Sequence, residues 1–220
     1  MKREILDIFD ENFILIGHSD YKTIHDKGFW HQVIHCWIMD PTSHLVIYQK
    51  RGKNKIIYPE MLDVSVAGHC RIHENPEITV KREAHEELGI KIDRRNLVKI
   101  GLRKNISSSE NNTNKEFQHI YFYKMKIDPN KIKINNSEIQ YIVLLNPEDV
   151  REAIETRISI DGIKLKNGSY ISERISYKEF IPSIDNYNLI IPLTIKEYLN
   201  GERQLYFNEK IQNSFGQKYS

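Results

Sequence analysis

The sequence predicts an α+β protein in which helices cover both faces of a mixed β-sheet. Segments with strand character and segments with helix character are interspersed along the 220 residues, without the strict strand–helix–strand alternation of a parallel sheet. Hydrophobic residues make up 40% of the chain and charged residues 28%, which is enough apolar material for a sizeable core. The length suits one domain with an extension, or at most two small domains.

The first part of the chain has the pattern of paired strands. Ile5–Phe9 and Phe13–Gly17 flank a polar turn and are expected to form a short hairpin. Two further β-rich segments, His31–Met39 and Leu45–Arg51, are separated by a turn that contains proline. A fifth strand is expected at about Asp63–Ala67.

The middle of the chain is expected to add three strands. They are predicted at Leu97–Leu102, Phe117–Ile127 and Ile139–Leu145, where apolar and aromatic residues dominate. The segment Asn105–Lys115 is polar, and we expect it to be a mobile loop.

The pattern changes after residue 145. A short helix is predicted at Pro147–Arg157 with Asn146 as its cap, followed by short strands around residues 166–168 and a helix at about Leu189–Leu199. We therefore divide the chain into a domain at 1–145 and an extension at 146–220, and we expect the extension to pack on the same domain. The sequence leaves open whether it also forms a lid over a ligand.

Charge and cysteine content limit the possible partners and the compartment. The formal charge of +2 is too close to neutral to indicate nucleic-acid polymers or membrane surfaces as partners. No apolar run approaches the length of a membrane span, and the N-terminal segment has acids where a signal peptide has its apolar region. The only cysteines, Cys36 and Cys70, are too few for a disulfide framework, so we expect a cytoplasmic protein. Whether it forms a homodimer stays open.

Residues 68–90 carry the strongest signal in the chain. Two glycines, four glutamates and an arginine follow one another at fixed spacings: Gly68, Glu74, Arg82, Glu83, Glu86, Glu87 and Gly89. Seven residues fixed at these spacings would match by chance about once in ten million. The pattern therefore indicates a specific site.

A helix is expected between the two glycines of this segment. Asn75 is a good N-cap, Pro76 suits the first helical position and Gly89 suits the C-terminal stop, so the helix would span about residues 76–88. Val80, Ala84 and Leu88 would then form its apolar stripe.

Three glutamates lie beside that stripe, within an arc of about 100°. They are Glu83, Glu86 and Glu87. Like charges on adjacent turns weaken an isolated helix, and a divalent cation would remove this repulsion. Carboxylate oxygens are the ligands that Mg²⁺ prefers. A solvated acidic face is the alternative, but it does not explain the flanking glycines and Arg82.

The segment resembles the Nudix box, G-x5-E-x7-R-E-U-x-E-E-x-G-U, where U is aliphatic. Every glycine and polar position matches, and only Ala84 is smaller than usual. The resemblance implies a Nudix domain at 1–145 with an α/β/α sandwich fold. It further implies hydrolysis of a phosphoanhydride bond in a nucleoside diphosphate linked to a further group, or in a related small diphosphate. Mg²⁺ would be the cofactor, with Mn²⁺ as a substitute.

The resemblance also implies roles for individual residues. Glu83 and Glu87 would bind the metal directly, Glu86 would be a further or bridging ligand, and the backbone carbonyl of Ala67 beside Gly68 would complete the protein ligands. Arg82 would orient one carboxylate through a bidentate pair, with Glu74 supporting the loop. Either Glu86 or Glu116 would accept a proton from water. Arg51 and Lys55 would bind phosphate oxygens, the alternative being a solvated basic turn.

Beyond the box, residues 4–145 resemble the Nudix subgroup most similar to type I isopentenyl-diphosphate isomerase. His25, His31 and His69 correspond to three histidines of that enzyme's metal site. Glu116 corresponds to one of its glutamates, and Asn114 stands where another is usual. The altered partners favour a polar surface position or a substrate contact for the histidines over a second metal site.

Two other functions remain as alternatives to the hydrolase. An isomerase requires two acid–base groups, but Ala67 occupies the position of the isomerase's catalytic cysteine, and a methyl group cannot transfer a proton. Cys70 is three residues away and would have to approach from another direction. A non-catalytic, nucleotide-sensing Nudix protein would usually have a damaged box, whereas this box is intact.

Overall fold

The computed structural model describes residues 4–214 apart from 56, 110–111, 167 and 184. The strands in this part of the chain are β1 (Ile5–Phe9), β2 (Leu15–Asp20), β3 (Trp30–Met39), β4 (Val46–Arg51), β5 (Leu62–Asp63), β6 (Val66–His69), β7 (Leu97–Ser109), β8 (Asn112–Lys124), β9 (Ile139–Leu145), β10 (Ser159–Lys166) and β11 (Ser169–Ser176). The α-helices are α1 (Tyr21–Lys27), α2 (Pro76–Leu88), α3 (Pro147–Thr156), α4 (Tyr187–Leu199) and α5 (Phe207–Ser214). Short 3₁₀ helices are η1 (Arg94–Asn96), η2 (Pro129–Lys131) and η3 (Tyr177–Glu179).

The strands form one mixed sheet. Its main path runs β11-β10-β9-β4-β3-β1-β2, with β5 paired to β4 and β6 paired to β3. Strand β8 lies parallel to β3, in a register from Trp30 opposite Lys115 to Met39 opposite Lys124. The other strand pairs in the described part of the chain are antiparallel. The predicted mixed sheet is confirmed.

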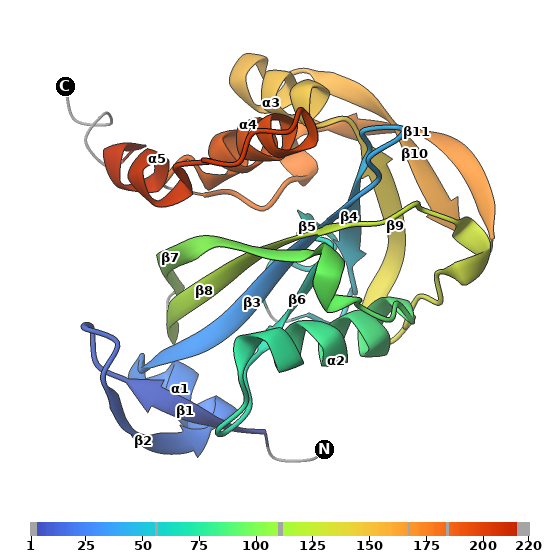
Figure 1. Ribbon diagram of the computed structural model, residues 1–220. Coiled ribbons are helices and arrows are strands. Elements are labelled where there is room, and N and C mark those ends of the chain that lie inside the picture. Colours follow the sequence, from blue (N-terminus) through green and yellow to red (C-terminus); the bar gives the residue numbers. More distant parts are fainter. Residues whose placement is uncertain (1–3, 56, 110–111, 167, 184, 215–220) are drawn as a thin grey trace.

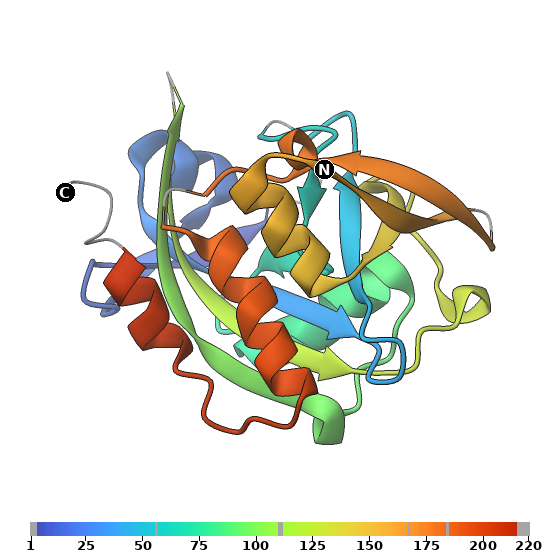
Figure 2. The ribbon, with the colours of Figure 1, turned by 90° about the horizontal axis from the view of Figure 1, so that it is seen from above.

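Helices cover both faces of this sheet, as predicted. Figure 1 shows α2 on one face and α3, α4 and α5 on the other. The core on the α2 side includes Val66, Val80 and Leu88. The core on the opposite side includes Trp37 and Ile191. Figure 2 looks down on α3 and α4, which lie side by side over the strands.

The prediction of a mobile loop at Asn105–Lys115 is wrong for the residues that the structure describes. Strands β7 and β8 continue through this region as a two-stranded ribbon, in register from Asn105 opposite Glu116 to Ser109 opposite Asn112. Ladder hydrogen bonds satisfy the backbone of this polar segment. Composition alone does not reveal such pairing, because β-strand formation depends on the partner strand.

The strand expected at about Asp63–Ala67 is interrupted. Strand β5 pairs with β4, and β6 pairs with β3. Ser65 lies at the break, where its buried hydroxyl donates to the carbonyl of Ile47 at 2.5 Å and accepts from the amide of Ile38 at 2.9 Å. The break lets the chain change partner, which brings Gly68 beside α2.

Helices α1 and α5 were not predicted. Helix α1 has local signals at both ends: the Asp20 side chain accepts a hydrogen bond from the Thr23 amide, and Gly28 ends the helix with φ 64°. With only seven residues, α1 has too few turns for a clear apolar period. Helix α5 packs through Phe207 and Ile211 against the core that α4 covers.

The C-terminal part of the chain continues the same sheet. Strand β10 pairs with β9, with Ile163 opposite Leu144, and β11 pairs with β10. Asn167, between these two strands, lies outside the described residues. None of the described helices is long and apolar enough to cross a membrane.

Candidate functional site

Helix α2 has the bounds and the buried face that the sequence predicts. Asn75 accepts a hydrogen bond from the Glu77 amide, and Gly89 ends the helix with φ 67°. Val80, Ala84 and Leu88 are fully buried. This stripe fixes the rotation of the helix, and the three glutamates therefore lie at the edge between helix and sheet.

The three glutamates differ in exposure. Glu87 is only 4% exposed, and the side chain of Glu83 is also largely covered. The side chain of Glu86 is 47% exposed. Two carboxylates therefore face the interior of the site, and the third faces its opening.

Gly68 leaves space for the carboxylate of Glu83 because it has no side chain. A Cβ atom built on Gly68 would lie 2.2 Å from both Cδ and Oε1 of Glu83. Real Cβ atoms do not approach other atoms this closely, so any side chain at position 68 would displace the carboxylate. The glycine allows the backbone of β6 and the Glu83 carboxylate to occupy adjacent positions.

Arg82 ties the helix to the loop before it. Its guanidinium forms a bidentate pair with Glu74, at 2.9 and 2.8 Å, and donates to one oxygen of Glu83 at 2.5 Å. It also donates to the backbone carbonyl of His69 at 3.0 Å. The bidentate partner is thus Glu74, which corrects the expectation that it would be a glutamate of the helix. Although burial opposes ionisation, the hydrogen bonds from Arg82 hold the pKa of Glu74 to about 2.

Ionisation of the two interior carboxylates, Glu83 and Glu87, is unfavourable in the absence of a cation. Burial raises the pKa of Glu83 to about 7 despite the adjacent Arg82. Burial also raises the pKa of Glu87 well above its usual range, and the charge of Glu83 adds to this effect. The Glu87 carboxylate accepts one long hydrogen bond, from the Ala67 amide at 3.4 Å. A divalent cation beside Gly68 would compensate both carboxylates, so these residues fit Mg²⁺.

Two further acids lie close to this cluster and have no motif signal. Glu138, beside the start of β9, raises the pKa of Glu87 in addition to burial. Glu4 lies 3.8 Å from both Arg71 and the Nδ1 atom of His69, and its charge adds to the raised pKa of Glu83. Both acids come from segments distant from the box in the sequence.

The two predicted phosphate-binding residues occupy different positions. Lys55 donates to Glu138 at 3.1 Å, and its charge opposes the rise in the pKa of Glu87. Arg51 instead points into its own loop, where it contacts Asp63 at 2.6 Å and the carbonyls of Ile57 and Tyr58. Lys55 is thus close to the carboxylates, whereas Arg51 anchors the loop.

His25, His31 and His69 converge, and the expectation of a polar surface position is wrong for His25 and His31, which are buried, whereas the alternative of a substrate contact stays a prediction. Their ligand atoms lie within 4.8 Å of one another, and this is the one such group among the described residues. His31 is fully buried. Burial lowers its pKa, and burial likewise lowers the pKa of His69 to about 3. Neutral imidazoles are the forms that bind metals.

The hydrogen bonds of His25 and His31 leave their Nε2 atoms available. Nδ1 of His25 lies 2.8 Å from the carbonyl of Tyr21, and Nδ1 of His31 lies 3.2 Å from that of Phe29. A carbonyl only accepts, so each Nδ1 carries the proton and each Nε2 has a free lone pair. Nε2 of His31 is buried without a hydrogen-bond partner. This is the arrangement of imidazoles that bind a metal, with the second nitrogen held by a carbonyl.

Glu116 lies opposite His31 in the register of β8 and β3. Its carboxylate accepts hydrogen bonds from the amides of Asn114 at 2.7 Å, Gln118 at 2.6 Å and Asn105 at 3.1 Å. Burial opposes ionisation, but the position of His31 and the hydrogen bonds from Asn114 and Gln118 outweigh it and lower the pKa of Glu116. The group is an ionised carboxylate that is half-buried in the protein.

Neither Cys36 nor Cys70 takes the place of the isomerase's catalytic cysteine, whose position Ala67 occupies. Ala67 packs against the core on the α4 side. Cys36 and Cys70 belong to the core on the α2 side. Burial raises the pKa of Cys70 to about 12, so it stays a thiol at neutral pH.

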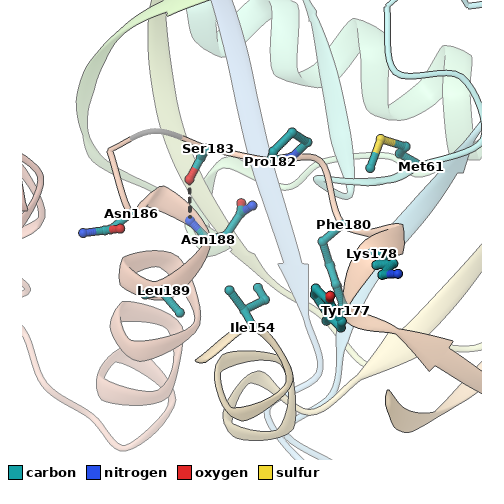
Figure 3. Close-up of a pocket in the computed structure, with 10 residues that line it drawn as sticks. All are labelled: Met61, Ile154, Tyr177, Lys178, Phe180, Pro182, Ser183, Asn186, Asn188 and Leu189. Carbon is teal, nitrogen blue, oxygen red and sulfur yellow. Dashed lines mark hydrogen bonds between the residues drawn. The ribbon is translucent and has the colours of Figure 1, made fainter. Parts of the chain in front are cut away.

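A separate pocket lies away from the glutamate and histidine groups, and none of their residues lines it. It has a volume of about 390 Å³ and lies between α3, α4 and the segment at 177–183, with Met61 at one side (Figure 3). Its walls are mainly apolar.

A glutamate-bearing helix packs against a glycine of the mixed sheet, which lies between two helical layers, and this is the arrangement expected of a Nudix domain. The NUDIX domain family matches residues 30–162, beyond the expected boundary at 145, and the chain belongs to this family.

The relatives agree with this assignment. An uncharacterised Nudix hydrolase of Clostridium acetobutylicum is 36% identical over 165 residues, which are 74% of this chain and 79% of that protein. An isopentenyl-diphosphate Delta-isomerase of Leifsonia xyli is 29% identical over 92 residues, which are 41% of this chain and 49% of that protein. The crystal structure of DR0079 from Deinococcus radiodurans shares the fold, with a TM-score of 0.53 and 22% identity over 70% of this chain and 90% of that chain. The chain is a hydrolase of the Nudix family.

Proposed function

We propose that this Nudix hydrolase cleaves the phosphoanhydride bond of a nucleoside diphosphate linked to a further group, or of a related small diphosphate, with Mg²⁺ as cofactor and Mn²⁺ as a substitute. The observation that carries the proposal is the buried pair of carboxylates, Glu83 and Glu87, beside Gly68. Their raised pKa values indicate a site that favours an added cation. Two free cysteines support a cytoplasmic location.

The metal ligands follow from the positions of the carboxylates. Glu83 and Glu87 would bind Mg²⁺ directly, Glu86 would be a further or bridging ligand, and the carbonyl of Ala67 beside Gly68 would supply a backbone oxygen. When bound, the metal neutralises the diphosphate and acidifies water. Arg82 contributes by position: it holds Glu83 and the end of β6 in one arrangement through Glu74 and the His69 carbonyl.

The chain's own residues also account for substrate binding and proton transfer. Lys55 would bind a phosphate oxygen, while Arg51 holds the loop that carries Lys55. In the hydrolysis, the water oxygen forms a bond to phosphorus, and the bridging oxygen leaves with the electron pair of the broken bond. Glu86 or Glu116 would accept the proton of the water. Glu86 can pass it to solvent, whereas Glu116 is half-buried and held by amide donors.

Isomerisation of a prenyl diphosphate is the second candidate function, and one observation favours it. His25, His31 and His69 converge, with Glu116 opposite His31 in the sheet register. These imidazoles suit a transition metal such as Zn²⁺. Ala67 speaks against isomerisation, because its methyl group cannot donate or accept a proton.

A substrate panel tests the proposal. Purified protein would be incubated with Mg²⁺ and ATP, ADP, UDP-glucose, ADP-ribose, NADH, coenzyme A or isopentenyl diphosphate, and the products separated by chromatography. We expect hydrolysis of at least one nucleotide, its loss on addition of a chelator and its recovery with Mg²⁺. Formation of dimethylallyl diphosphate would favour the isomerase, and no turnover of any compound would favour a nucleotide-sensing protein.

One pair of variants ties turnover to the proposed metal site. Glu87→Gln keeps the side-chain volume and removes a charge, so we expect kcat to fall at least about a hundredfold in a folded protein. Glu77→Gln makes the same chemical change on the same helix, at an exposed residue that pairs with Arg94, and should leave kcat within about twofold. Near-normal turnover of Glu87→Gln would refute the site.

A further inference from the structure

We propose that Asp185, in the C-terminal part of the chain, is a positioning residue that holds Arg103 away from Glu116 and so leaves the Glu116 carboxylate available to the reaction. This inference rests on the proposed function, in which Glu116 is one of the two candidate proton acceptors, and it takes Glu116 as that acceptor. Three observations carry it: a buried ion pair, the register of two strands, and the bracing of the segment that presents Asp185.

Arg103 and Asp185 form an ion pair that is closed off from water. Arg103 is 5% exposed and Asp185 is 2% exposed. The guanidinium binds both carboxylate oxygens, from Nε at 2.5 Å and from Nη2 at 2.8 Å. Burying two charges is costly, and hydrophobic residues often replace such pairs without loss of stability. A role beyond folding would explain why charges occupy these positions.

Only the side chain of Gln118 lies between the Arg103 guanidinium and the Glu116 carboxylate in the hydrogen-bond network of the described residues. Arg103 lies opposite Gln118 in the pairing of β7 and β8, and Asn105 lies opposite Glu116. Arg103 and Glu116 are therefore diagonal neighbours on one face of the sheet, a spacing that long side chains can bridge.

Gln118 separates the two charged groups. Its Oε1 atom accepts from Nη1 of Arg103 at 2.6 Å, and its Nε2 atom donates to Glu116 at 2.6 Å. This orientation of the amide is the one that chemistry permits, because a guanidinium only donates and an ionised carboxylate only accepts. With Arg103 fixed, Gln118 must present its amide group to Glu116.

The segment that carries Asp185 is braced on both sides. Tyr187 stacks under Arg103, with 4.2 Å between Cζ and the ring centre, and its hydroxyl accepts from the Trp37 indole at 3.1 Å. Figure 3 shows Ser183 and Asn188, which are joined by a hydrogen bond of 3.3 Å from the Asn188 amide to the Ser183 hydroxyl. Asn188 also donates to the carbonyl of Ile181.

Loss of Asp185 would leave the buried Arg103 guanidinium without its bidentate partner, with Glu116 as a diagonal neighbour on the same face of the sheet. The guanidinium would then move onto Glu116, displace the Gln118 amide and occupy the lone pairs that the reaction needs. The C-terminal part of the chain would thus act on the reacting centre through Arg103.

The test compares Asp185→Asn with the double variant Asp185→Asn/Arg103→Met. The substrate is the panel compound that the wild type hydrolyses fastest, at saturating Mg²⁺, and kcat is expressed per folded molecule. We expect kcat of Asp185→Asn to fall at least about tenfold, with KM within about twofold. Removing the guanidinium as well should return kcat to within about threefold of the wild type. A purely structural role would not move kcat of the folded molecules.

The matched control breaks another ion pair between the C-terminal part and the sheet. Lys50 pairs with Glu179 at 2.5 Å, and neither contacts Glu116 in the described structure. Glu179→Gln should leave kcat within about twofold. If Asp185→Asn does not fold, the double variant, which has no unpaired buried charge, decides: a kcat more than about tenfold below the wild type would overturn the inference.

Glu116→Gln separates failure of the inference from failure of its premise. If this variant keeps the wild-type kcat, Glu116 is not at the reacting centre, and the inference falls together with that part of the proposed function. If Glu116→Gln is inactive but folded Asp185→Asn keeps the wild-type kcat, the inference alone is wrong.

Discussion

Replacing Glu83 with Gln should change how the stability of the metal-free protein depends on pH. Burial raises the pKa of Glu83 from 4.5 to about 7, so the folded protein holds this proton more tightly than the unfolded chain does. The stability that Glu83 contributes is therefore fully present below pH 4.5 and is lost as pH rises through 7. Gln cannot ionise and should not show this loss.

The size of the effect follows from the two pKa values. Each pH unit between them corresponds to about 1.4 kcal/mol, so ionisation of Glu83 should cost the folded wild type about 3 kcal/mol by pH 8. The hydrogen bond that Arg82 donates to Glu83 at 2.5 Å can also be accepted by the Gln carbonyl, though without charge assistance, at a cost of about 1 kcal/mol that does not vary with pH. In a chain of this length, 3 kcal/mol corresponds to roughly 6–12 °C in Tm.

Urea unfolding in a chelator at pH 5, 6, 7 and 8 measures this difference. The free energy of unfolding of the wild type should fall relative to that of Glu83→Gln by about 2.5 kcal/mol across the range, because part of the loss occurs below pH 5. Glu77→Gln, exposed on the same helix, should follow the wild type. Saturating Mg²⁺ should remove the fall in the wild type, because the cation binds the ionised carboxylate. Parallel pH curves for wild type and Glu83→Gln would refute the reasoning.

Two further predictions concern the ends of the site. Gly68→Ala would place a methyl group 2.2 Å from Cδ of Glu83 and displace the carboxylate. We therefore expect at least about a tenfold weaker apparent affinity for Mg²⁺ when kcat is measured against metal concentration. An unchanged curve would contradict the proposed contact between Gly68 and Glu83. His69→Asn removes one of the three converging imidazoles and should lower the Mg²⁺-supported rate no more than about threefold; inactivity that Zn²⁺ restores and Mg²⁺ does not would make the histidine group the working site.

The sequence predicted helix α2 to the residue because its signals are local. Asn75, Pro76 and Gly89 satisfy or end the helix through their own backbone and side-chain chemistry. The apolar period of Val80, Ala84 and Leu88 then decides which face is buried. The same applies to β9, where a continuous apolar segment between polar turns has one favourable structure.

Strand ends and changes of partner were less predictable. The ribbon formed by the ends of β7 and β8 consists of polar residues that pair only because the two segments lie opposite each other. The break at Ser65 depends on two backbone groups from other strands. Such features depend on pairing energy that no single segment contains.

The sequence by itself determined the glutamate helix and its glycines, since each of those residues acts within about twenty positions of the next. Only the tertiary structure decided which distant groups join them. His25, His31 and His69 meet because the last turn of α1, the start of β3 and the end of β6 lie at one place, and Asp185 contacts Arg103 from a distant part of the chain. The physical reason is that a contact between distant residues depends on strand register and helix packing, which arise from the whole core and leave no mark in the local pattern.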